Sequence, residues 1–229
     1  AYILHHRLDF GNPFGTPVRA VAAGEVVFAG VDTAGDVFGA TNERFPKGFY
    51  GRLVVLRHDV GLAGQPLYSL YGHLSRLRVA RRQRVGAGAV IGEVGMAGIA
   101  LGPHLHLEVR DDARDYGHTY NPDLFLKPLP GTGHIVGRLS DPAGKSLPKV
   151  AVNLFKLDAK GGAGWWTASA TYPTGPVRSL PGLGENFVFS DLPVGRYRVV
   201  ANAGGGPIQQ DLEVVAEKAS GLVLCRRLS

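Results

Sequence analysis

Two histidines and a glutamate alternate along one predicted strand, His104, His106 and Glu108 within residues 102–110. Successive side chains of a strand point to opposite faces, so these three side chains share one face and the apolar residues between them share the other. Two imidazoles beside a carboxylate can bind a metal ion or transfer protons. A solvated strand face that carries two histidines is the alternative that this segment alone leaves open.

Two other segments carry side chains of the same types. His5 and Asp9 lie near the start of the chain, and His73 lies in the sequence Tyr-Gly-His-Leu at residues 71–74. Imidazoles and carboxylates are the ligands of a zinc ion that keeps one position open for water. Three segments that supply such groups favour a metal site over a solvated face.

The order of the motifs resembles the lysostaphin-type (LytM-like) zinc endopeptidases. The resemblance covers roughly residues 4 to 126, and the family usually has glycine where Arg7 stands. The motifs are His5-x-x-x-Asp9, Gly-Thr-Pro-Val-Arg-Ala at 15–20 with Gly-Glu-Val-Val at 24–27, Tyr-Gly-His-Leu at 71–74, Val-Gly-Ala-Gly-Ala-Val-Ile-Gly at 85–92, Gly-Pro-His-Leu-His-Leu-Glu at 102–108, and Asn-Pro at 121–122.

The resemblance implies a compact antiparallel β-sheet domain with a substrate groove. It also implies that His5, Asp9 and His106 bind Zn²⁺, and that His104 and His73 carry out acid–base chemistry on peptidoglycan peptides. We expect His104 to act as the general base, and His73 to orient the water or to stabilise the tetrahedral oxyanion.

Glu108 has two interpretations. It shares the strand face of the histidines, so it could fix the tautomer of an imidazole from behind the metal site. A surface salt bridge with an arginine is the other.

Four further histidines are left outside the predicted site. His6 would replace His5 as a ligand only if the register slipped by one residue. We expect His58 to lie at a strand end with a hydrogen bond to the backbone, and His118 and His134 to be exposed.

Composition predicts a globular, all-β chain of two domains. The chain has 229 residues, 45% apolar and 19% charged, with 33 glycines and 15 prolines, which suits short strands joined by many turns. Residues 31–48 have loop composition, and we expect them to form one wall of the groove. The strands predicted in the first domain cover residues 18–22, 25–29, 53–57, 67–71, 90–94 and 104–109.

A proline- and glycine-rich stretch at residues 127–133 predicts the domain boundary. We assign residues 1–130 to the peptidase domain and 131–229 to a small β-sandwich, since its predicted strands alternate at sandwich spacing. The second domain resembles the carboxypeptidase regulatory-like, transthyretin-like modules, which implies an accessory role. Its Trp165, Trp166 and Tyr172 could form a sugar-stacking platform or part of a core.

The net charge of +6 is compatible with attraction to anionic cell-wall polymers, or with solubility alone. Five arginines at residues 76–84 have no interleaved aromatic residues, so we expect a solvated loop and no nucleic-acid partner. The single cysteine, Cys225, cannot form an internal disulfide, and we expect it to be buried. The chain has no apolar run of about 18 residues, so the sequence predicts no transmembrane segment. The N-terminus has no signal-peptide pattern, which suggests a trimmed or processed form.

The sequence therefore predicts an extracytoplasmic zinc endopeptidase that cuts peptide stems or cross-links of bacterial peptidoglycan. A noncatalytic relative that binds the wall or activates another hydrolase is the alternative, although such proteins characteristically lose ligands or histidines that are present here. A metal-independent β-rich adhesion or scaffold protein would require the histidine pattern to be coincidental. The bond cleaved and the oligomeric state are not predicted.

Overall fold

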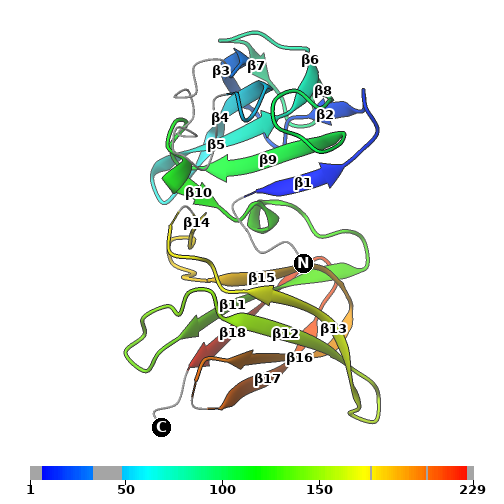
Figure 1. Ribbon diagram of the computed structural model, residues 1–229, viewed down its shortest axis with the longest axis vertical. Coiled ribbons are helices and arrows are strands. Elements are labelled where there is room, and N and C mark those ends of the chain that lie inside the picture. Colours follow the sequence, from blue (N-terminus) through cyan, green and yellow to red (C-terminus); the bar gives the residue numbers. More distant parts are fainter. Residues whose placement is uncertain (1–6, 33–47, 176, 205, 226–229) are drawn as a thin grey trace. The chain divides into compact units, whose positions relative to one another are not determined.

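The computed structural model describes residues 7–32, 48–175, 177–204 and 206–225, and these divide into two compact units (Figure 1). The N-terminal unit contains residues 7–124 together with 177–178, and the C-terminal unit contains residues 125–175 and 179–225. Strands make up nearly all the regular secondary structure of both units, as the all-β prediction requires. The assignment of residues 1–130 and 131–229 to two domains stays a prediction.

The N-terminal unit contains a large sheet and a small one. The large sheet has the order β14-β10-β9-β5-β4-β3-β7, and β1 also pairs with β9. All its neighbours are antiparallel except β10 and β14. Its strands are β1 (Leu8–Gly11), β3 (Gly24–Val31), β4 (Arg52–Leu62), β5 (Gln65–Gly72), β7 (Arg84–Val85), β9 (His104–Arg110), β10 (Thr119–Tyr120) and β14 (Val177–Arg178).

The small sheet has the order β2-β8-β6. It consists of β2 (Pro17–Arg19), β6 (Leu74–Leu77) and β8 (Val90–Val94). Two 3₁₀ helices, η1 (Tyr116–His118) and η2 (Pro122–Phe125), flank β10 in the sequence. The six strands predicted for this part of the chain are confirmed, with ends that differ by a few residues.

The middle of β4 is apolar on both faces. Leu53, Val54, Val55 and Leu56 are all buried, which is typical of a central strand covered on both sides. Leu53 and Val55 pack with three other buried residues, Phe49, Tyr50 and Leu70. Burial of this apolar surface stabilises the sheet, and the cluster reaches the end of β9 where the histidines lie.

Strand pairing brings the predicted site segments together. On β9, His106 pairs with Asp9 of β1 on one side and with Gly72 of β5 on the other. His73 follows Gly72 directly in the chain. Pairing at His106 therefore brings the Asp9 carboxylate and the segment that carries His73 together, although they lie far apart in the sequence.

The C-terminal unit has two sheets that share one hydrophobic core. One sheet has the order β15-β11-β18 and the other β13-β12-β16-β17. Its resemblance to carboxypeptidase regulatory-like sandwiches stays a prediction. The strands are β11 (Thr132–Ser140), β12 (Ala151–Leu157), β13 (Ala163–Ala170), β15 (Phe187–Pro193), β16 (Gly195–Asn202), β17 (Pro207–Val214) and β18 (Ala219–Cys225).

Several side chains differ from expectation. His134 is buried, and its Nδ1 accepts a hydrogen bond from the backbone N–H of Asp191. Tyr172 is buried too, whereas Trp165 and Trp166 are exposed, so the three do not form one aromatic platform. Cys225, predicted to be buried, is exposed at the end of an outer strand.

Within the described ranges, no helix is long and apolar enough to cross a membrane. The predicted groove wall falls largely on residues 33–47, which lie outside the described residues.

Candidate functional site

Asp9, His73, His104 and His106 meet at one end of β9. Asp9 Oδ1 lies 3.3 Å from His106 Nδ1 and 3.8 Å from His104 Nε2. One ligand nitrogen from each of the three histidines lies within 4.8 Å of the others. His5, the remaining predicted ligand, lies outside the described residues, as does His6. The structure thus brings together four of the five predicted site residues.

His73 is held in an unusual backbone conformation. Its φ angle is 61°, in the left-handed region that non-glycine residues rarely adopt. Its backbone N–H donates to the carbonyl of Tyr50 at 2.9 Å, and its Nδ1 lies 2.8 Å from the carbonyl of Ala97. A carbonyl only accepts, so Nδ1 carries the proton and the lone pair is on Nε2. Burial, followed by the charge of the neighbouring His106, lowers the pKa of His73 to about 4, so the ring is neutral at pH 7.

Two glycines allow the segments around His73 to approach. A Cβ atom on Gly51 would lie 2.2 Å from the carbonyl carbon of Ala97, and one on Gly98 would lie 2.5 Å from the carbonyl oxygen of Phe49. Both glycines have positive φ angles. Larger residues would push apart the chain segments that bind the backbone and the ring of His73.

His104 is partly exposed, with 19% of its side chain accessible. Its Nδ1 lies 2.8 Å from the carbonyl of Gly102. The same argument places the proton on Nδ1 and the lone pair on Nε2, the atom that faces Asp9. The ring centroids of His104 and His73 are 4.7 Å apart. The lone pairs on Nε2 of His73 and Nε2 of His104 are therefore both available at this end of β9.

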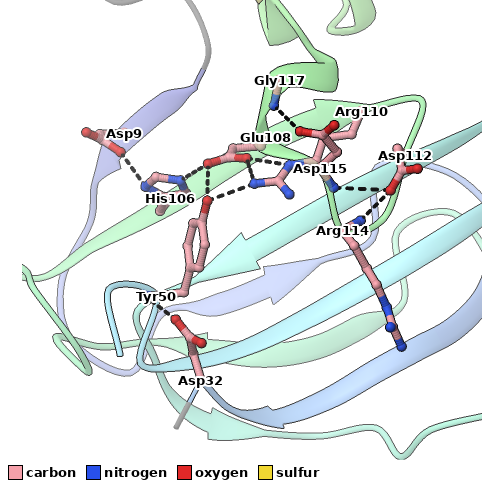
Figure 2. Close-up of polar contacts among 10 residues, drawn as sticks. All are labelled: Asp9, Asp32, Tyr50, His106, Glu108, Arg110, Asp112, Arg114, Asp115 and Gly117. Atoms are coloured by element: carbon pink, nitrogen blue, oxygen red, sulfur yellow. Dashed lines mark hydrogen bonds and ion pairs between the residues drawn. The ribbon is translucent and has the colours of Figure 1, made fainter. Parts of the chain in front are cut away.

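His106 is completely buried, and its two nitrogens face opposite sides. Nδ1 faces Asp9, while Nε2 lies 2.7 Å from Glu108 Oε1 (Figure 2). Burial lowers the pKa of His106, but its contacts with the carboxylates of Asp9 and Glu108 outweigh burial and raise the pKa above its ordinary value. Glu108 is buried rather than part of a surface salt bridge, and it contacts both His106 and Arg110.

Arg7 lies beside Asp9. Its Nε is 3.2 Å from Asp9 Oδ2, and its guanidinium carbon lies 5.8 Å from the ring centroid of Phe49. The Phe49 ring makes edge contacts with both His73 and His106. Arg7 therefore holds the carboxylate oxygen that does not face His106.

Sequence reasoning missed the contributions of Phe49, Tyr50 and Arg110. Arg110 follows Glu108 on the same face of β9, so continued alternation could have placed it. Phe49 and Tyr50 come just before β4, and no motif in the sequence connects them with β9.

The donor set fits a zinc ion. Zinc takes imidazole nitrogens and carboxylate oxygens at about 2.0–2.2 Å in tetrahedral geometry, which places two ligand atoms about 3.4 Å apart. The 3.3 Å between Asp9 Oδ1 and His106 Nδ1 matches that separation. Asp9 and His106 can therefore bind the same ion.

Several known proteins are similar to this chain. Residues 4–122 match the model of peptidase family M23. The chain is 39% identical over 127 residues to DD-carboxypeptidase/endopeptidase Mpg of Neisseria meningitidis, covering 56% of this chain and 24% of that protein. It is 31% identical over 180 residues to glycyl-glycine endopeptidase ALE-1 of Staphylococcus capitis, covering 77% of this chain and 43% of that protein. The chain thus spans less than half the length of either relative.

Among solved structures, the catalytic domain of the antimicrobial peptidase lysostaphin from Staphylococcus simulans matches 53% of this chain and 77% of its own. The sequence identity is 27% and the TM-score is 0.43. The family match covers more than half of the chain and includes every histidine and carboxylate of the site. The chain therefore belongs to peptidase family M23.

Proposed function

We propose that this chain is a zinc-dependent endopeptidase that hydrolyses peptide bonds in the stems or cross-links of bacterial peptidoglycan. The observation that carries the proposal is the convergence of four groups. Asp9 Oδ1 and His106 Nδ1 face each other at 3.3 Å, and the lone pairs of His73 and His104 are on nitrogens beside them. Two relatives named as endopeptidases, one of them a glycyl-glycine endopeptidase, support the same class of reaction.

Asp9 and His106, together with His5, would hold the metal. Bound zinc supplies Lewis-acid polarisation of the scissile carbonyl and lowers the pKa of a water molecule. Arg7 fixes the second oxygen of Asp9, so the first stays directed at the site. His106, fully buried, has its ring position fixed by packing.

His104 is the proposed general base. Its Nε2 accepts a proton from water as the water oxygen bonds to the scissile carbonyl carbon, and it delivers that proton to the leaving amine as the C–N bond breaks. The hydrogen bond from Nδ1 to Gly102 keeps Nε2 as the accepting atom throughout. Partial exposure gives the substrate access to His104.

His73 orients the water by accepting a hydrogen bond. Its one N–H is used by the carbonyl of Ala97, so the neutral ring has no donor left for an oxyanion. Of the two roles expected for His73, the tautomer therefore favours orientation of the water.

Because the proposed substrate is peptidoglycan, the proposed activity lies outside the cytoplasm. The noncatalytic alternative predicts binding to the wall without release of fragments. Digestion of purified sacculi, followed by mass spectrometry of the soluble products, separates the two. We expect new amino termini that name the bond cut, their loss on chelation, and their return when zinc is added. Wall binding without new termini at any zinc concentration would refute the proposal.

A further inference from the structure

A network of polar side chains lies behind His106, on the side away from Asp9 (Figure 2). Tyr50, Glu108 and Arg110 are each at most 1% exposed. Glu108 Oε1 lies 2.7 Å from His106 Nε2 and 3.0 Å from the hydroxyl of Tyr50. Glu108 Oε2 accepts from Arg110 Nε at 2.7 Å and also contacts Nη2.

The contacts determine the charge of Glu108. A carboxylate offers about four acceptor sites, and the hydroxyl of Tyr50 and two N–H groups of Arg110 occupy three of them. Arg110 can only donate, and its Nη2 also donates to the Tyr50 oxygen at 2.7 Å, which leaves the Tyr50 proton for Glu108. Burial, followed by the nearby Glu108, raises the pKa of Tyr50 well above its ordinary value, so this proton is retained. Glu108 is therefore an ionised acceptor neutralised by Arg110.

An ionised carboxylate 2.7 Å from an imidazole nitrogen requires a proton on that nitrogen, since two lone pairs at this distance would repel. We propose that Tyr50, Glu108 and Arg110 are positioning residues that fix His106 in the tautomer protonated at Nε2, so that its Nδ1 lone pair faces Asp9. The value of this tautomer for catalysis rests on the proposed function, because only a metal ion between Asp9 and His106 would use the lone pair.

Without the network, Asp9 would favour the opposite tautomer. Its Oδ1 lies 3.3 Å from Nδ1, close enough to accept a proton carried there. A neutral His106 that lost the acceptor on its Nε2 side would then donate from Nδ1 to Asp9, and a metal ion would have to displace this proton. The network thus sets which of two carboxylates receives the His106 proton.

The test uses the full chain, freed of metal and labelled with ¹⁵N at histidine. Nitrogen chemical shifts, recorded above the raised pKa of His106 so that the ring is neutral, distinguish the two tautomers, and chelator competition measures zinc affinity. In the unsubstituted protein we expect His106 to be protonated at Nε2.

The double substitution Glu108→Leu with Arg110→Met removes the acceptor and its buried counter-charge together, which avoids an unpaired buried ion. We expect His106 to move to the Nδ1-protonated form and zinc affinity to fall about 10- to 100-fold.

Two milder variants keep the test decisive if the double variant does not fold. Glu108→Gln keeps a carbonyl oxygen that can accept from Nε2, so the tautomer should persist while zinc binding weakens. Tyr50→Phe leaves the carboxylate in place and should change zinc affinity by only a few-fold. Tyr120→Phe is its matched control, since Tyr120 is buried in the same sheet and donates to Asp111 at 2.6 Å, away from the histidines. It should leave zinc affinity unchanged.

A neutral His106 that carries its single proton on Nδ1 in the unsubstituted, metal-free protein would overturn the inference. So would an unchanged tautomer together with unchanged zinc affinity in a folded double variant, because the network would then only stabilise the fold. Failure of the proposed function is distinguishable. If the tautomer switches and zinc affinity falls as expected, but the unsubstituted protein releases no wall fragments, the positioning role stands and the endopeptidase proposal fails.

Discussion

Asp9 and His106 are directly paired across β1 and β9, and Asp9 Oδ1 lies 3.3 Å from His106 Nδ1. The separation depends on strand register. A slip of one residue between β1 and β9 would turn the Asp9 side chain to the other face of the sheet. The same pairing places Gly11 opposite His104, so the register positions both histidines of the strand.

Substitution of the three histidines should separate zinc binding from proton transfer. His106→Ala removes a proposed ligand and should greatly lower both zinc affinity and hydrolysis. His104→Ala and His73→Ala should retain zinc and lower the rate by about 10²-fold or more, because they remove a proton acceptor and a group that orients the water. Zinc content and the rate of peptide hydrolysis, measured on the same preparations, test this division. Equal zinc loss in all three variants would show that the roles are wrongly divided.

Gly51→Ala should destabilise the N-terminal unit and disturb His73. The new Cβ would lie 2.2 Å from the carbonyl carbon of Ala97 at a φ angle of 61°. Backbone strain of about 1–2 kcal/mol adds to the cost of the clash. Gly64→Ala is the matched control, because Gly64 has a φ angle of 79° but open space around its Cβ position. Thermal unfolding should be affected more by Gly51→Ala than by Gly64→Ala, and similar losses would contradict the close-approach argument.

Glu185 should make the stability of the C-terminal unit depend on pH. Burial raises its pKa from 4.5 to about 7, although backbone N–H groups and Tyr172 oppose this shift. Because the folded pKa exceeds the unfolded one, the contribution to stability is present below pH 4.5 and is lost as pH rises through about 7. Between these values the unfolding free energy should fall by about 1–3 kcal/mol.

Glu185→Gln removes this titration, so its stability relative to the unsubstituted protein should rise from about pH 5 to pH 8. Denaturant unfolding followed by tryptophan fluorescence reports on this unit alone, since both tryptophans of the chain, Trp165 and Trp166, lie in it. A pH-independent difference between the two proteins would contradict the prediction.

Removal of residues 131–229 tests the modular assignment. We expect cleavage of a short soluble peptide to stay within a few-fold, because all residues assigned to chemistry precede residue 131, while action on whole sacculi should decrease. The fragment also loses β14, which pairs with β10, and Arg178, which donates to Asp111 at 2.9 Å. Its thermal stability should therefore be lower. A folded, zinc-loaded fragment that cannot cut the peptide would contradict the assignment.

Alternation along residues 104–110 was sufficient to predict that His104, His106 and Glu108 share a face, and the contact between His106 and Glu108 confirms this for the pair. The burial of Glu108 was not predictable, because it depends on Tyr50 and Arg110, and no local pattern shows that residue 50 lies beside β9. His134 was wrongly expected to be exposed, since its hydrogen bond comes from a backbone group 57 residues away. Local periodicity thus predicts faces, whereas partners from other strands depend on the pairing of the whole sheet.

Titration of zinc into the metal-free protein, with occupancy and peptide hydrolysis followed together, tests the central claim most directly. We expect hydrolysis to be absent at the start and to rise in proportion to occupancy until about one ion is bound per chain. The His106→Ala variant should show neither tight occupancy nor hydrolysis over the same range. Full hydrolysis before any zinc is added, or full occupancy without cleavage of any peptidoglycan peptide, would contradict the account.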